Sequence, residues 1–125
     1  MANFDRRKLV AGLRSIAGEE LRSVAVYDED GYEFLYLRDE LDDRATAISD
    51  EIYQNLVLEG IGKEYLEELF DAGTLCCTLH EFETLRSYHF VTKQFEGLFI
   101  SVDTESQVRS AAVREIVDDT LEEPQ

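Results

Sequence analysis

Four parts of the chain carry apolar residues at the spacing of an amphipathic helix. The clearest is residues 40–59, where Ile48, Ile52 and Leu56 recur every four residues and would form one apolar stripe. Gly60 should end or bend this helix, because glycine inside a helix costs about 1 kcal/mol relative to alanine. The predicted helices cover residues 5–18, 40–59, 63–73 and, from a capping-box pattern at Thr104–Gln107 onward, the region up to residue 121.

Five short runs of apolar, β-branched and aromatic residues are typical of strands. Asp30-Gly31 lies between the first two runs and is the strongest short signal for a hairpin. The last three runs follow one another through short connections at Phe82–Glu83 and Lys93–Glu96, which favours antiparallel pairing. The predicted strands are residues 22–28, 32–38, 74–82, 84–92 and 96–103.

The resulting order of elements, α-β-β-α-(α)-β-β-β-α, predicts an α+β fold. Tight turns between consecutive strands indicate a five-stranded antiparallel sheet, and helices are expected on both of its faces. A chain of 125 residues is most simply one domain, here residues 1–121, since that size supports a hydrophobic core. The polar end, residues 122–125, is expected to be a disordered tail.

Charge is the strongest compositional signal. The chain has 28 acidic and 12 basic residues, a net charge of −16, and only three of the basic residues are lysines. Such an excess repels itself at low salt and is screened at molar salt, so the composition is typical of a halophilic cytoplasm. An acidic mimic of nucleic acid is the alternative, but the acids are spread along the whole chain. The sign of the charge disfavours nucleic acid as a partner.

Membrane partners are not expected from this sequence. There is no apolar run close to the roughly 20 residues that a membrane span needs. The first residues, "MANFDRRKLV", are basic but are followed by no apolar core of a signal peptide. We therefore expect a cytoplasmic protein.

The two cysteines and two histidines cluster in the stretch "GTLCCTLHEFETLRSYHF". Cys76 and Cys77 would point to opposite faces of a strand, and His80 lies roughly 13 Å along the strand from Cys76. Ligands of one zinc must lie within about 4 Å of each other. Pairing around Phe82–Glu83 would bring Cys76 near His89, which supplies only two ligands. We expect neither a metal nor a cofactor, and thiols that act as small hydrophobes or, alternatively, as redox sensors.

Catalytic residues are not predicted either. No serine or cysteine stands at an evident triad spacing from His80 or His89. We therefore expect a protein that is not an enzyme.

The element order resembles the roadblock/longin-like group, with a helix before the first hairpin and another after the last strand. The stretches "LVLEGIGKEYLEELFDAGTLCCTLHEF" and "GLFISVD" are similar to small haloarchaeal proteins of no assigned activity. The resemblance implies the sheet order 2-1-5-4-3, a homodimer or heterodimer, and an adaptor or GTPase-regulating role without catalytic residues.

This sheet order would leave strand 74–82 at an edge. Up to Glu81 that strand contains no Lys, Pro or charge, the residues with which natural edges are usually protected. We expect it to pair with a second copy or a related chain, flanked by the helix of residues 41–56. The predicted interface residues are Ile48, Ile52, Leu56, Cys76, Thr78 and His80.

The sequence thus favours a non-catalytic interaction or regulatory adaptor module, dimeric or bound to a protein partner. The alternative is a domain that senses a small molecule held between sheet and helix. A polar pocket would favour the sensor, and a large apolar patch at a sheet edge would favour the module.

Overall fold

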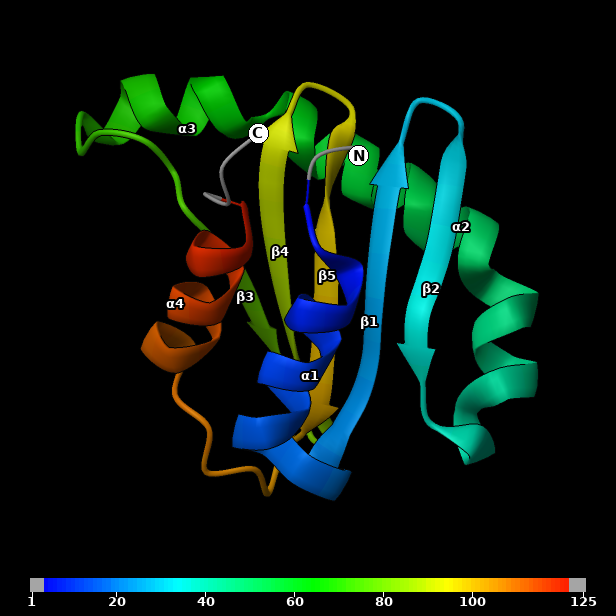
Figure 1. The fold of residues 1–125 in the computed structure, drawn as a ribbon. Coiled ribbons are helices and arrows are strands. Elements are labelled where there is room, and N and C mark those ends of the chain that lie inside the picture. The colour runs from blue at the N-terminus through cyan, green and yellow to red at the C-terminus, as the bar shows by residue number, and fades with distance from the viewer. Residues whose placement is uncertain (1–3, 122–125) are drawn as a thin grey trace.

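The computed structural model describes residues 4–121 and shows helices and strands in the predicted order (Figure 1). Two short 3-10 turns, Gly18–Glu20 and Asp39–Leu41, lie beside the first helix and before the second. The helices are α1 (Arg6–Ala17), α2 (Asp42–Ile61), α3 (Lys63–Phe70) and α4 (Ser110–Leu121). The strands are β1 (Leu21–Asp28), β2 (Gly31–Leu37), β3 (Thr78–Glu81), β4 (Leu85–Lys93) and β5 (Glu96–Asp103). The expected tail, residues 122–125, lies outside the described residues.

The sheet has the order β2-β1-β5-β4-β3, and each neighbouring pair is antiparallel. Figure 1 shows α1 and α4 on one face and α2 crossing the other. The prediction of a five-stranded antiparallel sheet with helices on both faces is therefore confirmed. So is the position of β3, which lies at one edge of the sheet.

The main hydrophobic core fills the space between the sheet and the pair α1 and α4. Leu9 and Leu13 of α1 and Val113 and Val117 of α4 are fully enclosed there. They meet the alternate side chains of three strands that point to this face, as the two-residue period of a strand requires. These strand residues include Val24, Val26, Tyr88, Phe90, Leu98, Ile100 and Val102.

The opposite face of the sheet is covered less completely. Leu56 is the buried residue of α2, although the helix is 20 residues long. The strand side chains beneath it are unusually polar, because Ser23, His89 and Ser101 are all buried. This face consequently has room for a groove and for a polar network, which are described below.

Several predicted boundaries are wrong, and three of these differences follow from specific contacts. Helix α2 continues through Gly60 to Ile61, since its last turns are held by the burial of Leu56 and by a contact of Glu59 with the sheet. Strand β3 begins at Thr78 rather than at residue 74.

Helix α4 begins at Ser110, so Thr104–Gln107 does not act as a capping box. Arg86 explains this third difference. Its guanidinium donates hydrogen bonds to the carbonyls of Thr104, Ser106 and Val108, at 3.3, 3.2 and 3.0 Å, and these hold the segment outside a helix.

Candidate interaction surface

The backbone groups that edge strand β3 leaves unpaired follow from its register with β4. Phe82 N–H donates to the carbonyl of Leu85 at 2.7 Å, which makes these two residues a hydrogen-bonded pair across the hairpin. Hydrogen-bonded pairs alternate along an antiparallel ladder, so His80 and Thr78 also direct their backbone groups toward β4. Leu79 and Glu81 consequently direct their N–H and C=O groups outward. These are the groups that another strand would bind.

The segment before β3 is held by α3 instead of by β4. Leu75 N–H donates to Glu67 Oε2 at 2.7 Å, and the same carboxylate oxygen pairs with Lys63 Nζ at 2.7 Å. Residues 74–77 therefore lie outside the ladder, and the predicted strand is shortened to four residues.

Exposed apolar side chains are concentrated near this edge. In the described part of the chain nine large hydrophobic residues are exposed, and eight of them fall within residues 58–82. Helix α3 contributes four of the eight, buries none of its residues and projects past β4 on the side of the sheet where β3 is the edge (Figure 1). We call this set the apolar edge: Leu58, Ile61, Tyr65, Leu66, Leu69, Phe70, Leu79 and Phe82.

The six residues predicted for the interface do not lie together. Helix α2 begins over β2, at the far edge of the sheet, and only its last turn approaches β3 (Figure 1). Ile48 and Ile52 point toward the sheet, and Leu56 is buried.

The other three predicted residues lie at or just before β3. Cys76 is exposed ahead of the strand, Thr78 is half-buried at its first position and His80 is exposed. The sequence predicts α3 as a helix of residues 63–73, but none of its exposed apolar residues is among the predicted interface residues.

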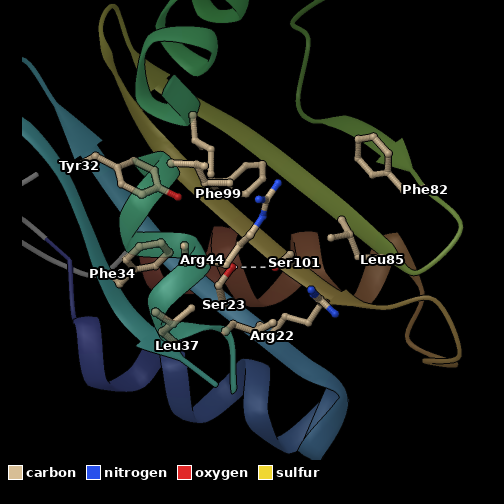
Figure 2. Close-up of a pocket in the computed structure, with 14 residues that line it drawn as sticks. Arg22, Ser23, Tyr32, Phe34, Leu37, Arg44, Phe82, Leu85, Phe99 and Ser101 are labelled. Atoms are coloured by element: carbon tan, nitrogen blue, oxygen red, sulfur yellow. Dashed lines mark hydrogen bonds between the residues drawn. The ribbon is translucent and has the colours of Figure 1, made fainter. Parts of the chain in front are cut away.

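A groove with a volume of about 320 Å³ separates α2 from the sheet and is partly open to solvent (Figure 2). We call it the α2 groove. Its walls are mainly apolar, and Ser23 and Ser101 share a 2.7 Å hydrogen bond in its lining. The Tyr32 hydroxyl is buried and has no hydrogen-bond partner among residues 4–121, and burial raises the pKa of this phenol. The apolar lining includes Phe34, Leu37, Ile48, Ile52, Phe82 and Phe99.

A buried polar network joins the end of α2 to the sheet. Glu59 Oε1 lies 2.5 Å from His89 Nδ1, and His89 Nε2 lies 2.6 Å from the Tyr27 hydroxyl. A carboxylate only accepts, so Nδ1 carries the proton and the neutral ring accepts the Tyr27 O–H at Nε2. Burial lowers the pKa of His89, which keeps the ring neutral, although Glu59 opposes the shift.

Gly97 provides the space for this network. It pairs with Tyr27 across β1 and β5, and a Cβ on Gly97 would stand 2.7 Å from the Tyr27 hydroxyl. Tyr27 and His89 are each 2% exposed, so the network is closed to a substrate. Its geometry is that of a structural connection between α2 and the sheet.

The second histidine lies at the outer end of the same network. His80 Nε2 of β3 is 3.7 Å from Glu59 Oε2, the carboxylate oxygen that His89 does not bind. The predicted pairing of Cys76 with His89 is wrong, because the turn lies at residues 83–84 and the partner of His89 is Thr78. Within residues 4–121 of one chain, no three His, Cys, Asp or Glu side chains are grouped closely enough to hold a metal ion.

Comparison with solved structures agrees with this topology. MglB of Myxococcus xanthus aligns with a TM-score of 0.59 and 17% identity, covering 95% of this chain and 86% of that chain. At this identity the likeness concerns the fold alone, and it supports a roadblock-like fold, for which the observed order β2-β1-β5-β4-β3 was expected. MglC of the same organism aligns with a TM-score of 0.48 and 15% identity, covering 91% of this chain and 93% of that chain.

In the described residues no helix combines the length and the apolar character needed to cross a bilayer.

Sequence comparison places the chain in a family. No curated protein matches it. One family matches residues 7–122, nearly the whole length. The chain therefore belongs to the family described as Domain of unknown function (DUF7522).

Proposed function

We propose that this chain is a non-catalytic interaction or regulatory adaptor module that acts as a dimer in a salt-rich cytoplasm. The observation that carries the proposal is the apolar edge, which lies on the same side of the sheet as edge strand β3 with its outward backbone groups (Figure 1). Soluble monomers rarely expose apolar surface in this concentrated form, and such surface is typical of protein contacts. The partner is a second copy of the chain or a related chain.

Backbone pairing through β3 alone would be too small to hold a dimer. The strand has four residues, whereas a stable interface buries about 800 Å² on each partner. The exposed residues of α3 and the end of α2 supply apolar area on the same side of the sheet. Strand pairing would then fix the orientation of the two chains, and apolar burial would supply most of the affinity.

The experiment is light scattering in about 2 M KCl, the salt range in which the repulsion between two chains of charge −16 is screened. We expect a dimer for the wild type. Leu79→Pro should give a monomer, because it removes an outward N–H without breaking a bond to β4. Leu79→Ala keeps that N–H and should weaken the dimer less.

Two further variants separate apolar burial from a general loss of stability. Phe70→Asp places a charge on α3 and should dissociate the dimer. Ile16→Asp is the matched control, because Ile16 is exposed on α1 and lies outside the apolar edge. A wild-type chain that stays monomeric at high micromolar concentration would rule out the homodimer.

Small-molecule sensing is the second candidate, and the α2 groove is the observation that favours it. An apolar cavity with one unsatisfied hydroxyl and the guanidinium of Arg44 in its lining is suited to a small ligand with an apolar body. Thermal melts with a panel of organic acids would test it. A ligand that stabilises the wild type but not Ile52→Trp, in which the groove is filled, would favour sensing.

A further inference from the structure

Glu59 and His80 have the arrangement of two metal ligands at the edge of the sheet. Glu59 Oε2 and His80 Nε2 are 3.7 Å apart, and their side chains are 24% and 49% exposed. Two ligands at about 2.0–2.2 Å from a tetrahedral zinc stand roughly 3.3–3.6 Å apart. A small rotation of the exposed His80 ring would therefore let one ion bind both atoms.

The carboxylate is already oriented for this role. Its other oxygen is fixed by His89, which is fixed in turn by Tyr27, and both of those residues are buried. Supporting hydrogen bonds of this kind orient metal ligands and raise their affinity for the ion. The network therefore does not use the second oxygen of Glu59, which faces His80 of the edge strand.

One chain supplies only two ligands, whereas zinc takes four in a closed site. The pairing of two β3 strands would supply the rest, and to this extent the inference rests on the proposed dimer. The outward backbone groups of β3 belong to Leu79 and Glu81. In one twofold register Leu79 pairs with Glu81 of the partner subunit. Only in this register do the outward N–H and C=O groups of both residues bond to residues of the partner's β3.

Other twofold registers are less favourable. If the twofold axis passed through Leu79, Glu81 would have to pair with Cys77 of the partner subunit, and Cys77 lies outside β3. Centring it on Glu81 would place two carboxylates directly opposite each other, which is destabilising.

The favoured register places His80 opposite His80 of the partner subunit. Because the backbone groups of His80 point toward β4, this is a pair without mutual hydrogen bonds, with Cα atoms about 4.5 Å apart. Both rings then lie on the α2 face, each beside a Glu59. Without a cation, two carboxylates would approach each other between chains that each carry a charge of −16.

We infer that a divalent zinc ion binds on the twofold axis, held by His80 Nε2 and Glu59 Oε2 of each chain. Two imidazoles and two carboxylates form a four-ligand set that suits tetrahedral zinc. The ion neutralises both carboxylates and joins the two β3 strands, so zinc binding and dimerisation are linked.

The test begins with protein freed of metal by a chelator, in molar KCl at neutral pH. Zinc is added, and oligomeric state and bound metal are measured together by light scattering and elemental analysis. We expect one zinc per two chains and a dissociation constant of the dimer at least tenfold lower with zinc than with chelator. Cobalt in place of zinc should give the intense visible absorption of a tetrahedral site only in the dimer.

Three variants assign the ligands. His80→Asn alters an exposed side chain, so it should fold normally and lose the ion. Glu59→Gln should also lose it, although this variant disturbs the bond to His89 as well. Glu81→Gln is the matched control, because it removes a carboxylate from the same strand on the opposite face and should keep the zinc.

The outcomes separate this inference from the proposed dimer. A dimer that is equally tight with chelator and holds no zinc overturns the zinc site and leaves the adaptor proposal standing. A chain that stays monomeric with and without zinc overturns both. One zinc per chain on a monomer, or zinc retained by His80→Asn, overturns the bridging site.

Discussion

Arg38 and Asp103 form a bidentate ion pair that joins the end of β2 to the end of β5. The Arg38 Nη1 atom lies 2.7 Å from Asp103 Oδ2, and Nη2 lies 3.0 Å from Oδ1. Arg22 of β1 donates to the same carboxylate at 3.0 Å. All three side chains are about 20% exposed, so the cluster is largely shielded from solvent. It connects three neighbouring strands at one end of the sheet.

This cluster predicts a specific loss of stability in acid. Hydrogen bonding from Arg38, and then from Arg22, lowers the pKa of Asp103 below its usual value of about 3.9. The stabilisation is therefore complete above the pKa of the unfolded chain and is lost as pH falls through the lower pKa of the folded chain. Asp103→Asn should reduce the free energy of unfolding at pH 7 by about 1–2 kcal/mol.

Urea denaturation at a series of pH values between 7 and 3 measures this effect. The difference between wild type and Asp103→Asn should shrink toward the acid end. Glu105→Gln, an exposed carboxylate two residues further along, should change the stability by less than about 0.5 kcal/mol. An equal loss in both variants would contradict the assignment to this ion pair.

Two glycine-to-alanine substitutions should have opposite effects. A Cβ at Gly97 would stand 2.4 Å from the backbone oxygen of Phe90, which cannot move away without distorting β4. Gly97→Ala should therefore destabilise the fold by about 1–3 kcal/mol or more. At Gly60 of α2 the nearest atom would be 3.6 Å away on Val91, which is ordinary contact.

Gly60→Ala should consequently stabilise the protein by up to about 1 kcal/mol, because alanine is the better helix former. Thermal melts of the two variants and the wild type are a sufficient measurement. If Gly60→Ala also destabilised, α2 would not run through this position as a regular helix.

The pattern of the sequence was enough to predict the order of the helices and strands and the α+β fold class. Asp30-Gly31 marked the first hairpin, and the spacing of Ile48, Ile52 and Leu56 marked α2, because both signals depend on local geometry. The order of the strands came from the resemblance to roadblock/longin-like proteins. These predictions agree with the observed topology.

The candidate site could not be predicted in the same way. Placing the turn at residues 82–83 instead of 83–84 shifts the partner of His89 by two residues, from Cys76 to Thr78. The contact between Glu59 and His80 depends on that register and on α2 continuing through Gly60. Neither is visible in a hydrophobic pattern, because both are decided by tertiary packing.

The two cysteines should differ sharply in reactivity. Cys76 is exposed, whereas burial raises the pKa of the Cys77 thiol to about 11. At pH 8 a thiol with that pKa is ionised to roughly one part in a thousand, and only the thiolate is nucleophilic. Iodoacetamide should therefore label Cys76 first.

Peptide mass spectrometry after timed labelling, at low protein concentration to favour the monomer, measures the order of reaction. Cys76→Ser should remove the fast phase, and unfolding in guanidinium should make both thiols react. Equal rates in the folded chain would show that Cys77 is accessible.

Salt should stabilise the fold, because the net charge of −16 is carried by 125 residues. The Debye length falls from about 10 Å at 0.1 M to about 3 Å at 1 M, so repulsion between exposed carboxylates is largely screened in concentrated KCl. We expect the melting temperature to be higher in 2 M than in 0.1 M KCl. A melting temperature that does not rise with salt would remove the argument for a halophilic origin.

One carboxylate provides a sharper test of the same mechanism. Asp119 is exposed in the last turn of α4, at the negative end of the helix dipole, where that turn has no basic residue. Asp119→Asn should raise the free energy of unfolding by about 0.3–1 kcal/mol in low salt. The gain should largely disappear in 2 M KCl, because screening already removes the same repulsion in the wild type. A gain that is equal at both salt concentrations would mean that helix propensity, and not charge, sets the effect.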